Sequence, residues 1–79
     1  MSAQAKRQDY ATSLLADLKA NRSALPRGEE LAGWLQDYLK QTRSADREPD
    51  AALATENLLA IDAHLAAFDI PATARPSLN

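Results

Sequence analysis

The chain is short and rich in helix-forming residues, since its 79 residues include 17 Ala and 12 Leu but no Val and only six Ile and Thr together. This composition predicts one small all-α domain. Without cysteine, the sequence excludes a disulfide scaffold, a thiolate zinc site and a cysteine nucleophile. The net charge of -2 is uneven, because residues 48–79 contain one Arg against five acidic side chains.

The first predicted helix covers about residues 3–21. Ser2 is a suitable N-cap, because its hydroxyl can accept a hydrogen bond from a free amide of the first turn. Arg7 falls on the apolar side, where either a frayed helix start or a salt bridge to the third helix would accommodate it. Five residues share one arc of the helical wheel and predict the buried face: Tyr10, Ala11, Leu14, Leu15 and Leu18.

The second predicted helix covers about residues 28–43, and its start is open, because Pro26 can occupy a first helical position and Gly28 can cap it. Glu29 and Glu30 then fall in the first turn, where negative charge suits the helix dipole. Trp34 and Tyr38 either fill the centre of the bundle, which is the favoured interpretation, or form an exposed binding hot spot. The apolar pattern consists of Leu31, Trp34, Leu35, Tyr38 and Leu39.

The third predicted helix covers about residues 49–68, and Pro71 ends the helical geometry behind it. Short connections favour antiparallel neighbours, so we expect a small antiparallel three-helix bundle over residues 1–70. Residues 71–79 are expected to form an extended or disordered tail, unless Ile70 and Leu78 pack back onto the bundle. The core stripe of this helix is predicted to be Ala54, Leu58, Ile61, Leu65 and Phe68.

A second arc of the third helix is also apolar, and two interpretations are open. The helix can lie between the other two and bury both arcs, or the second arc can contact another chain. Small side chains favour the second option, since they let helices approach closely and cost little entropy to bury. The candidate partner-binding residues on this arc are Leu53, Leu59, Ala60, Ala63 and Ala67.

Chemical motifs are scarce. His64 is the only histidine, and no spacing of His and carboxylates matches a zinc or calcium site, so we expect no catalytic, metal-binding or cofactor-binding residues. The third helix carries no Lys or Arg, so direct nucleic-acid binding is not expected, and a small DNA-binding regulator is a weaker hypothesis. No apolar run is long enough to span a membrane, and no secretory signal is present, so a cytoplasmic location is expected.

The function expected from these patterns is that of a non-enzymatic protein–protein interaction module, a small acidic binding or inhibitory factor. Phages and mobile elements encode factors of this kind, as in anti-CRISPR-like occlusion of a host complex. Four carboxylates could complement a basic, nucleic-acid-binding surface of the partner, or could simply keep a small domain in solution: Asp50, Glu56, Asp62 and Asp69. The alternative is a structural or regulatory homodimer assembled through the third helix.

Overall fold

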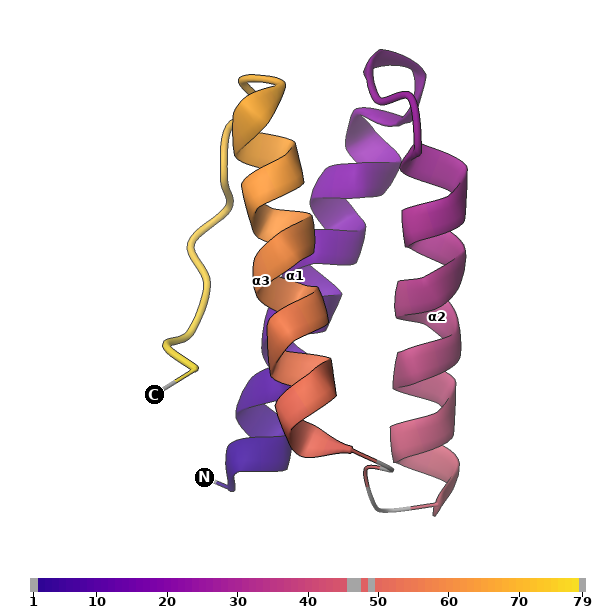
Figure 1. Cartoon of the computed structure of the whole chain (residues 1–79), viewed down its shortest axis with the longest axis vertical. Helices are drawn as coiled ribbons and strands as arrows, with labels where there is room; N and C mark the ends of the chain where they lie inside the picture. Colours follow the sequence, from indigo (N-terminus) through magenta and orange to yellow (C-terminus); the bar gives the residue numbers. More distant parts are fainter. Residues whose placement is uncertain (1, 46–47, 49, 79) are drawn as a thin grey trace.

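A computed structural model describes residues 2–45, 48 and 50–78 of the chain. Within these residues the regular structure consists of α1 (Ala3–Ala20), a short 3-10 turn η1 (Arg22–Ala24), α2 (Gly28–Ala45) and α3 (Ala51–Ala67), without a strand. The three helices run up, down and up in a body of 33 × 22 × 18 Å (Figure 1). The predicted antiparallel three-helix bundle is therefore confirmed.

The start of α1 agrees with its predicted cap, whereas the end of α2 and the cap of α3 were not predicted. The Ser2 hydroxyl accepts a hydrogen bond from the Ala5 amide at 3.1 Å, which confirms the predicted N-cap of α1. Helix α2 begins at Gly28 and continues to Ala45, two residues beyond the predicted end. Pro49, the predicted start of the third helix, lies outside the described residues; α3 begins at Ala51, and the Asp50 carboxylate caps it.

The core is formed by one face of each helix, and α1 packs against both α2 and α3. The predicted core stripes are confirmed over most of their length, but Phe68 is 43% exposed. It follows the last residue of α3, where the chain turns away with Asp69 in the left-handed region at φ 57°. The largest fully buried side chains are Leu14, Leu18, Leu35, Leu58, Leu65 and Thr42.

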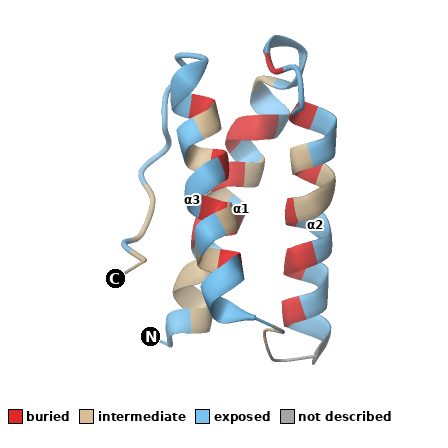
Figure 2. Ribbon diagram, viewed as in Figure 1, coloured by how far each residue is buried: buried red, intermediate tan, exposed pale blue. Residues whose placement is uncertain are grey.

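Helix α3 does not lie between the other two helices, so the interpretation that it buries both of its apolar arcs within the chain is wrong. The helix in contact with both neighbours is α1, and α3 therefore buries one stripe only. Figure 2 shows exposed residues along much of α3, and the second arc belongs to this exposed surface. The arc predicted from the sequence is thus left uncovered by the described chain.

One ionic cluster joins α1, α2 and the connection before α3. The Arg7 Nε donates to both carboxylate oxygens of Glu48, at 2.9 and 2.8 Å, and the Tyr38 hydroxyl donates to the same carboxylate. The Glu48 side chain is only 4% exposed. The Arg7 guanidinium holds the pKa of Glu48 below its ordinary value, and burial raises the pKa of Tyr38. Arg7 therefore forms a salt bridge, but the expected partner on the third helix is wrong, because Glu48 precedes α3.

A second ionic cluster fastens the C-terminal segment to the bundle. The tail returns alongside α3 on the side away from α2 (Figure 1), and Arg75 pairs with both Asp17 of α1 and Asp62 of α3. The Thr73 amide donates to Asp17 at 3.2 Å, while Tyr10 donates to Asp62. Burial, with this bond, raises the pKa of Tyr10 to about 12. Side chains of the tail also reach the edge of the core: Ile70 and Leu78.

Candidate functional site

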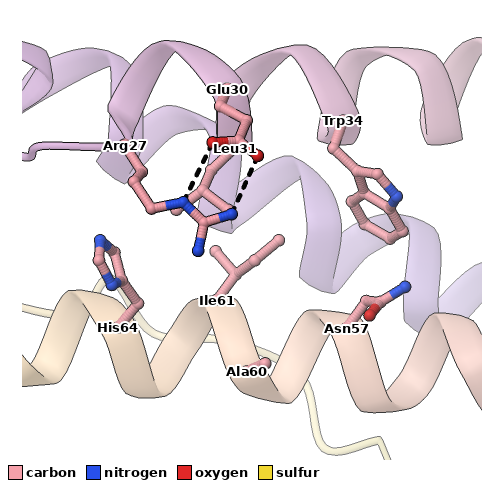
Figure 3. Close-up of a pocket in the computed structure, with 8 residues that line it drawn as sticks. All are labelled: Arg27, Glu30, Leu31, Trp34, Asn57, Ala60, Ile61 and His64. Carbon is pink, nitrogen blue, oxygen red and sulfur yellow. Dashed lines mark hydrogen bonds and ion pairs between the residues drawn. The ribbon is translucent and has the colours of Figure 1, made fainter.

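A groove of about 560 Å³ lies between α2 and α3 (Figure 3). Its walls are two helices that each pack closely on α1, and the side chains between them leave this space open. Figure 3 shows side chains from the two helices pointing toward one another across the groove. The lining residues are Arg27, Glu30, Leu31, Trp34, Asn57, Ala60, Ile61 and His64.

Trp34 is the largest side chain of the groove. Its ring stacks on Tyr38, with centroids 5.5 Å apart and planes 5° from parallel. The interpretation that both rings fill the bundle centre holds for the buried Tyr38 and is wrong for Trp34, which is only partly buried at the edge of the core. The opposing residues on α3, Asn57 and Ala60, have short side chains, and part of the amphipathic indole remains exposed in the groove.

The groove continues past Trp34 toward the first turn of α3. A second hollow of about 270 Å³ shares Trp34 and Asn57 with the first. Its lining residues also include Tyr38, Gln41, Asp50, Leu53 and Ala54. The two hollows together form one groove, which we call the α2–α3 groove. One wall is residues 27–41, which comprise part of α2 and the residue before it, and the other wall is residues 50–64, which comprise part of α3 and its N-cap.

The five apolar residues predicted to bind a partner all lie on the exposed surface of α3. Leu53 and Leu59 are 53% and 50% exposed, and with the exposed alanines beside them they form a contiguous apolar surface. Leu53 and Ala60 also line the α2–α3 groove, so the groove and the exposed arc form one continuous surface. We call this arc the outer face of α3, and it comprises Leu53, Leu59, Ala60, Ala63 and Ala67.

The four predicted acidic contact residues do not form one surface. Asp50, Glu56 and Asp69 are exposed. Asp62 lies on the side of α3 that faces the tail, where it accepts a hydrogen bond from Tyr10 and pairs with Arg75 at 3.2 Å. The helical wheel of α3 places Asp62 outside the core stripe. It could not predict the contact with Arg75, because Arg75 lies in the tail, 13 positions later in the sequence.

Some polar groups in the first hollow of the groove have hydrogen-bond partners and one does not. Arg27 donates to Glu30 at 3.1 and 3.0 Å, and this contact lowers the pKa of the Glu30 carboxyl. His64 touches Phe68, with ring centroids 5.0 Å apart, and its Nε2 has no hydrogen-bond partner among the described residues. The lining of the groove is therefore half polar and half apolar, and one of its polar side chains contains a buried atom without a described partner.

The lining combines groups suited to van der Waals contact with groups that can form hydrogen bonds. It brings together an indole, aliphatic side chains, one amide and one imidazole, with the charged pair Arg27–Glu30 at its end. Across the described residues, no three His, Cys, Asp or Glu side chains gather closely enough to hold a metal ion. Sequence reasoning missed Leu31, Asn57 and His64 as parts of a shared groove, because they come from two helices whose relative placement a single-helix pattern does not contain.

Comparison with protein-family models, with curated proteins and with solved structures gives no match. In the part of the chain that the structure describes, no helix has both the length and the apolarity required to cross a bilayer. Function is therefore inferred from the surface of this chain alone.

Proposed function

We propose that the protein is a non-enzymatic protein–protein interaction module that binds a partner through the α2–α3 groove and the outer face of α3. The observation that carries this proposal is the continuous apolar surface formed by Trp34, Leu53 and Ala60 beside an open groove. Contiguous apolar surface on a small domain is typical of a contact site. Tryptophan is, in addition, the residue type most enriched among binding hot spots.

The form of action we propose is that of a binding or inhibitory factor, which covers a surface on a larger complex. Support comes from the small size of the chain and its net charge of -2, features that suit occlusion of a host surface by a phage or mobile-element factor. The exposed carboxylates of Asp50 and Glu56 flank the apolar surface and would favour a basic partner.

The experiment that tests the proposal is site-specific photo-crosslinking. A photoreactive side chain placed at Ala63, on the outer face of α3, should give a discrete adduct in extracts of the cells that make the chain. The matched control is the same group at Ala16, an exposed alanine of α1. No adduct from position 63, or the same adducts from both positions, would contradict the proposal.

A homodimer through α3 is the second candidate, and the exposed small residues Ala60, Ala63 and Ala67 favour it, because they would let two helices approach closely. The mass of the adduct separates the candidates, since a homodimer gives a species of twice the chain mass. Ala63→Arg should then dissociate that dimer in sedimentation velocity, whereas Ala16→Arg should not.

A further inference from the structure

The α2–α3 groove has the length and shape to hold a helix. Its lining spans 14 residue steps on each wall, from Arg27 to Gln41 and from Asp50 to His64. At 1.5 Å per residue this is a length of about 20 Å, which corresponds to about four helical turns. Because α1 packs on both walls, a helix seated in the groove would complete a four-helix arrangement.

The floor of the groove provides contacts for an apolar helix face. Leu31, Trp34 and Ile61 supply large side chains, and Leu53 stands half exposed at one end. Ala60 lies between these larger residues and would let the backbone of an incoming helix approach closely. Recognition of an amphipathic helix by an apolar groove requires this combination of large anchoring side chains and a close approach.

The rims of the groove are acidic on both sides. On α2, Glu30 and Asp37 fall on the same helical stripe as Trp34, at spacings of four and three residues. On α3, Asp50 lines the groove and Glu56 lies between Leu53 and Ala60 on their stripe. All four carboxylates belong to exposed residues. Arg27 and the imidazole of His64 are the basic groups among the described lining residues. Because Arg27 pairs with Glu30, these two add no net charge, and the acidity of the rims comes from Asp37, Asp50 and Glu56.

This charge pattern selects the occupant. A second copy that docked symmetrically through the same surface would bring α3, which has no Lys or Arg, or the acidic rim of α2 against these carboxylates. Nucleic acid would bring phosphates against them. A helix whose polar flanks carry Lys or Arg would instead pair with both rims while its apolar face covers Trp34 and Ala60.

We propose that the α2–α3 groove receives an amphipathic helix of a partner protein, about four turns long and with Lys or Arg on both flanks of its apolar face. This inference rests on the proposed interaction function and names the chemistry of the partner.

The test uses two synthetic helical peptides of about four turns that share the same apolar residues and lack Trp and Tyr. One carries Lys and Arg on its flanks and the other carries Glu. Trp34 is the only tryptophan of the chain, so its fluorescence reports occupation of the groove directly. We expect saturable binding of the basic peptide, at least about tenfold tighter than that of the acidic peptide and weakened by added salt.

Variants locate the binding. Ala60→Arg should lower the affinity for the basic peptide at least about tenfold, because its side chain fills the groove. Ala16→Arg adds the same side chain at an exposed position of α1 and should leave the affinity unchanged. Circular dichroism of both variants checks that the fold is intact. Glu56→Lys should reduce the difference in affinity between the basic and the acidic peptide, because it reverses one charge on the rim of the groove.

Three results would overturn the inference. The first is no saturable binding of the basic peptide, and the second is equal affinity for both peptides. The third is a dimer of this chain that Ala60→Arg dissociates and Ala16→Arg does not, because the occupant would then be a second copy. The crosslink from Ala63 does not depend on peptide charge, so the proposed interaction function can survive the first two results, whereas the third would favour the homodimer.

Discussion

Glu48 is a residue whose role depends on its partners rather than on its place in the sequence. It lies in the connection before α3, yet its buried carboxylate accepts hydrogen bonds from Arg7 of α1 and Tyr38 of α2. Removing one member of a buried ion pair leaves the other charge without compensation in a poorly solvated site. The connection is therefore tied to both preceding helices by one side chain.

We predict that Glu48→Gln lowers the free energy of unfolding by about 3 kcal/mol at neutral pH, because the Arg7 charge is left buried without its counterion. Urea denaturation measures the loss. The matched control is Glu29→Gln, since the Arg22–Glu29 pair is exposed by 51% and 78% and should contribute less than about 1 kcal/mol. Equal losses in both variants would contradict the assigned role of Glu48.

The same carboxylate should give the stability a distinct pH dependence. Arg7 holds the pKa of Glu48 below its ordinary value of 4.5, so the unfolded chain binds this proton first as the pH falls. The stabilisation is complete above about pH 4.5 and is lost as the pH drops through the lower pKa of the folded state. Glu48→Gln should make the urea midpoint depend less on pH over this acidic range. An unchanged pH dependence of the midpoint would contradict the lowered pKa of Glu48.

At the residue scale, the sequence pattern identified the unusual side chains but not their partners. Arg7 stands out because a charge falls on an apolar arc, and it does form a salt bridge, but with Glu48 and not with the third helix. Its partner, Glu48, and the partners of Asp62 depend on how loops and tail return to the bundle. Helical periodicity describes one helix at a time and contains no information on those long-range pairings.

At the scale of single elements, α2 contains a glycine with no steric reason for its presence. A Cβ at Gly33 would meet nothing within 4 Å outside its own helix. We predict that Gly33→Ala raises the free energy of unfolding by about 0.5–1 kcal/mol, because glycine loses more backbone entropy in a helix interior. Thermal denaturation tests this, and a destabilised variant would contradict it.

Gly28 provides the contrast within the same helix. A Cβ there would lie 3.2 Å from the Arg22 carbonyl oxygen and 3.4 Å from the Leu25 Cβ. Gly28→Ala should therefore raise the free energy of unfolding less than Gly33→Ala does, or lower it, because the turn before α2 must shift to make room for the added methyl group.

The C-terminal segment is an element without regular structure, and Asp17 is the residue of α1 that holds it. This buried carboxylate receives the Thr73 amide and the Arg75 guanidinium. We predict that Asp17→Asn releases the tail, and that the Thr73 amide loses its protection against hydrogen exchange while the amides of α1 and α2 keep theirs. Retained protection at Thr73 would show that the tail is held by other contacts.

Element boundaries were predictable because they depend on local chemistry. Ser2 caps α1 as its hydroxyl allows, and the left-handed Asp69 follows α3 just before the predicted stop at Pro71. The end of α2 at Ala45 was missed by two residues, since nothing between Arg43 and Ala45 opposes a helix. The exposure of Phe68 was missed because it depends on where the chain turns away from the bundle.

At the scale of the whole molecule, the decisive feature is which helix touches both others. The amphipathic stripes are compatible with either α1 or α3 in that position, and periodicity alone does not separate these arrangements. With α1 in contact with both, Trp34 and Ala60 face one another across an open groove, and the outer face of α3 stays exposed. The candidate site is thus a consequence of packing order, which the sequence patterns left open.

The most direct test is to locate the bound basic peptide by following the amide chemical shifts of the full chain during its addition. We predict that the basic peptide shifts the amides of Leu31, Trp34, Leu53 and Ala60 most strongly, together with the Trp34 indole resonance. The amides of Thr12 and Ala16, exposed on α1, should change little. Shifts centred on α1, or spread evenly over the three helices, would contradict the claim that the α2–α3 groove is the binding surface.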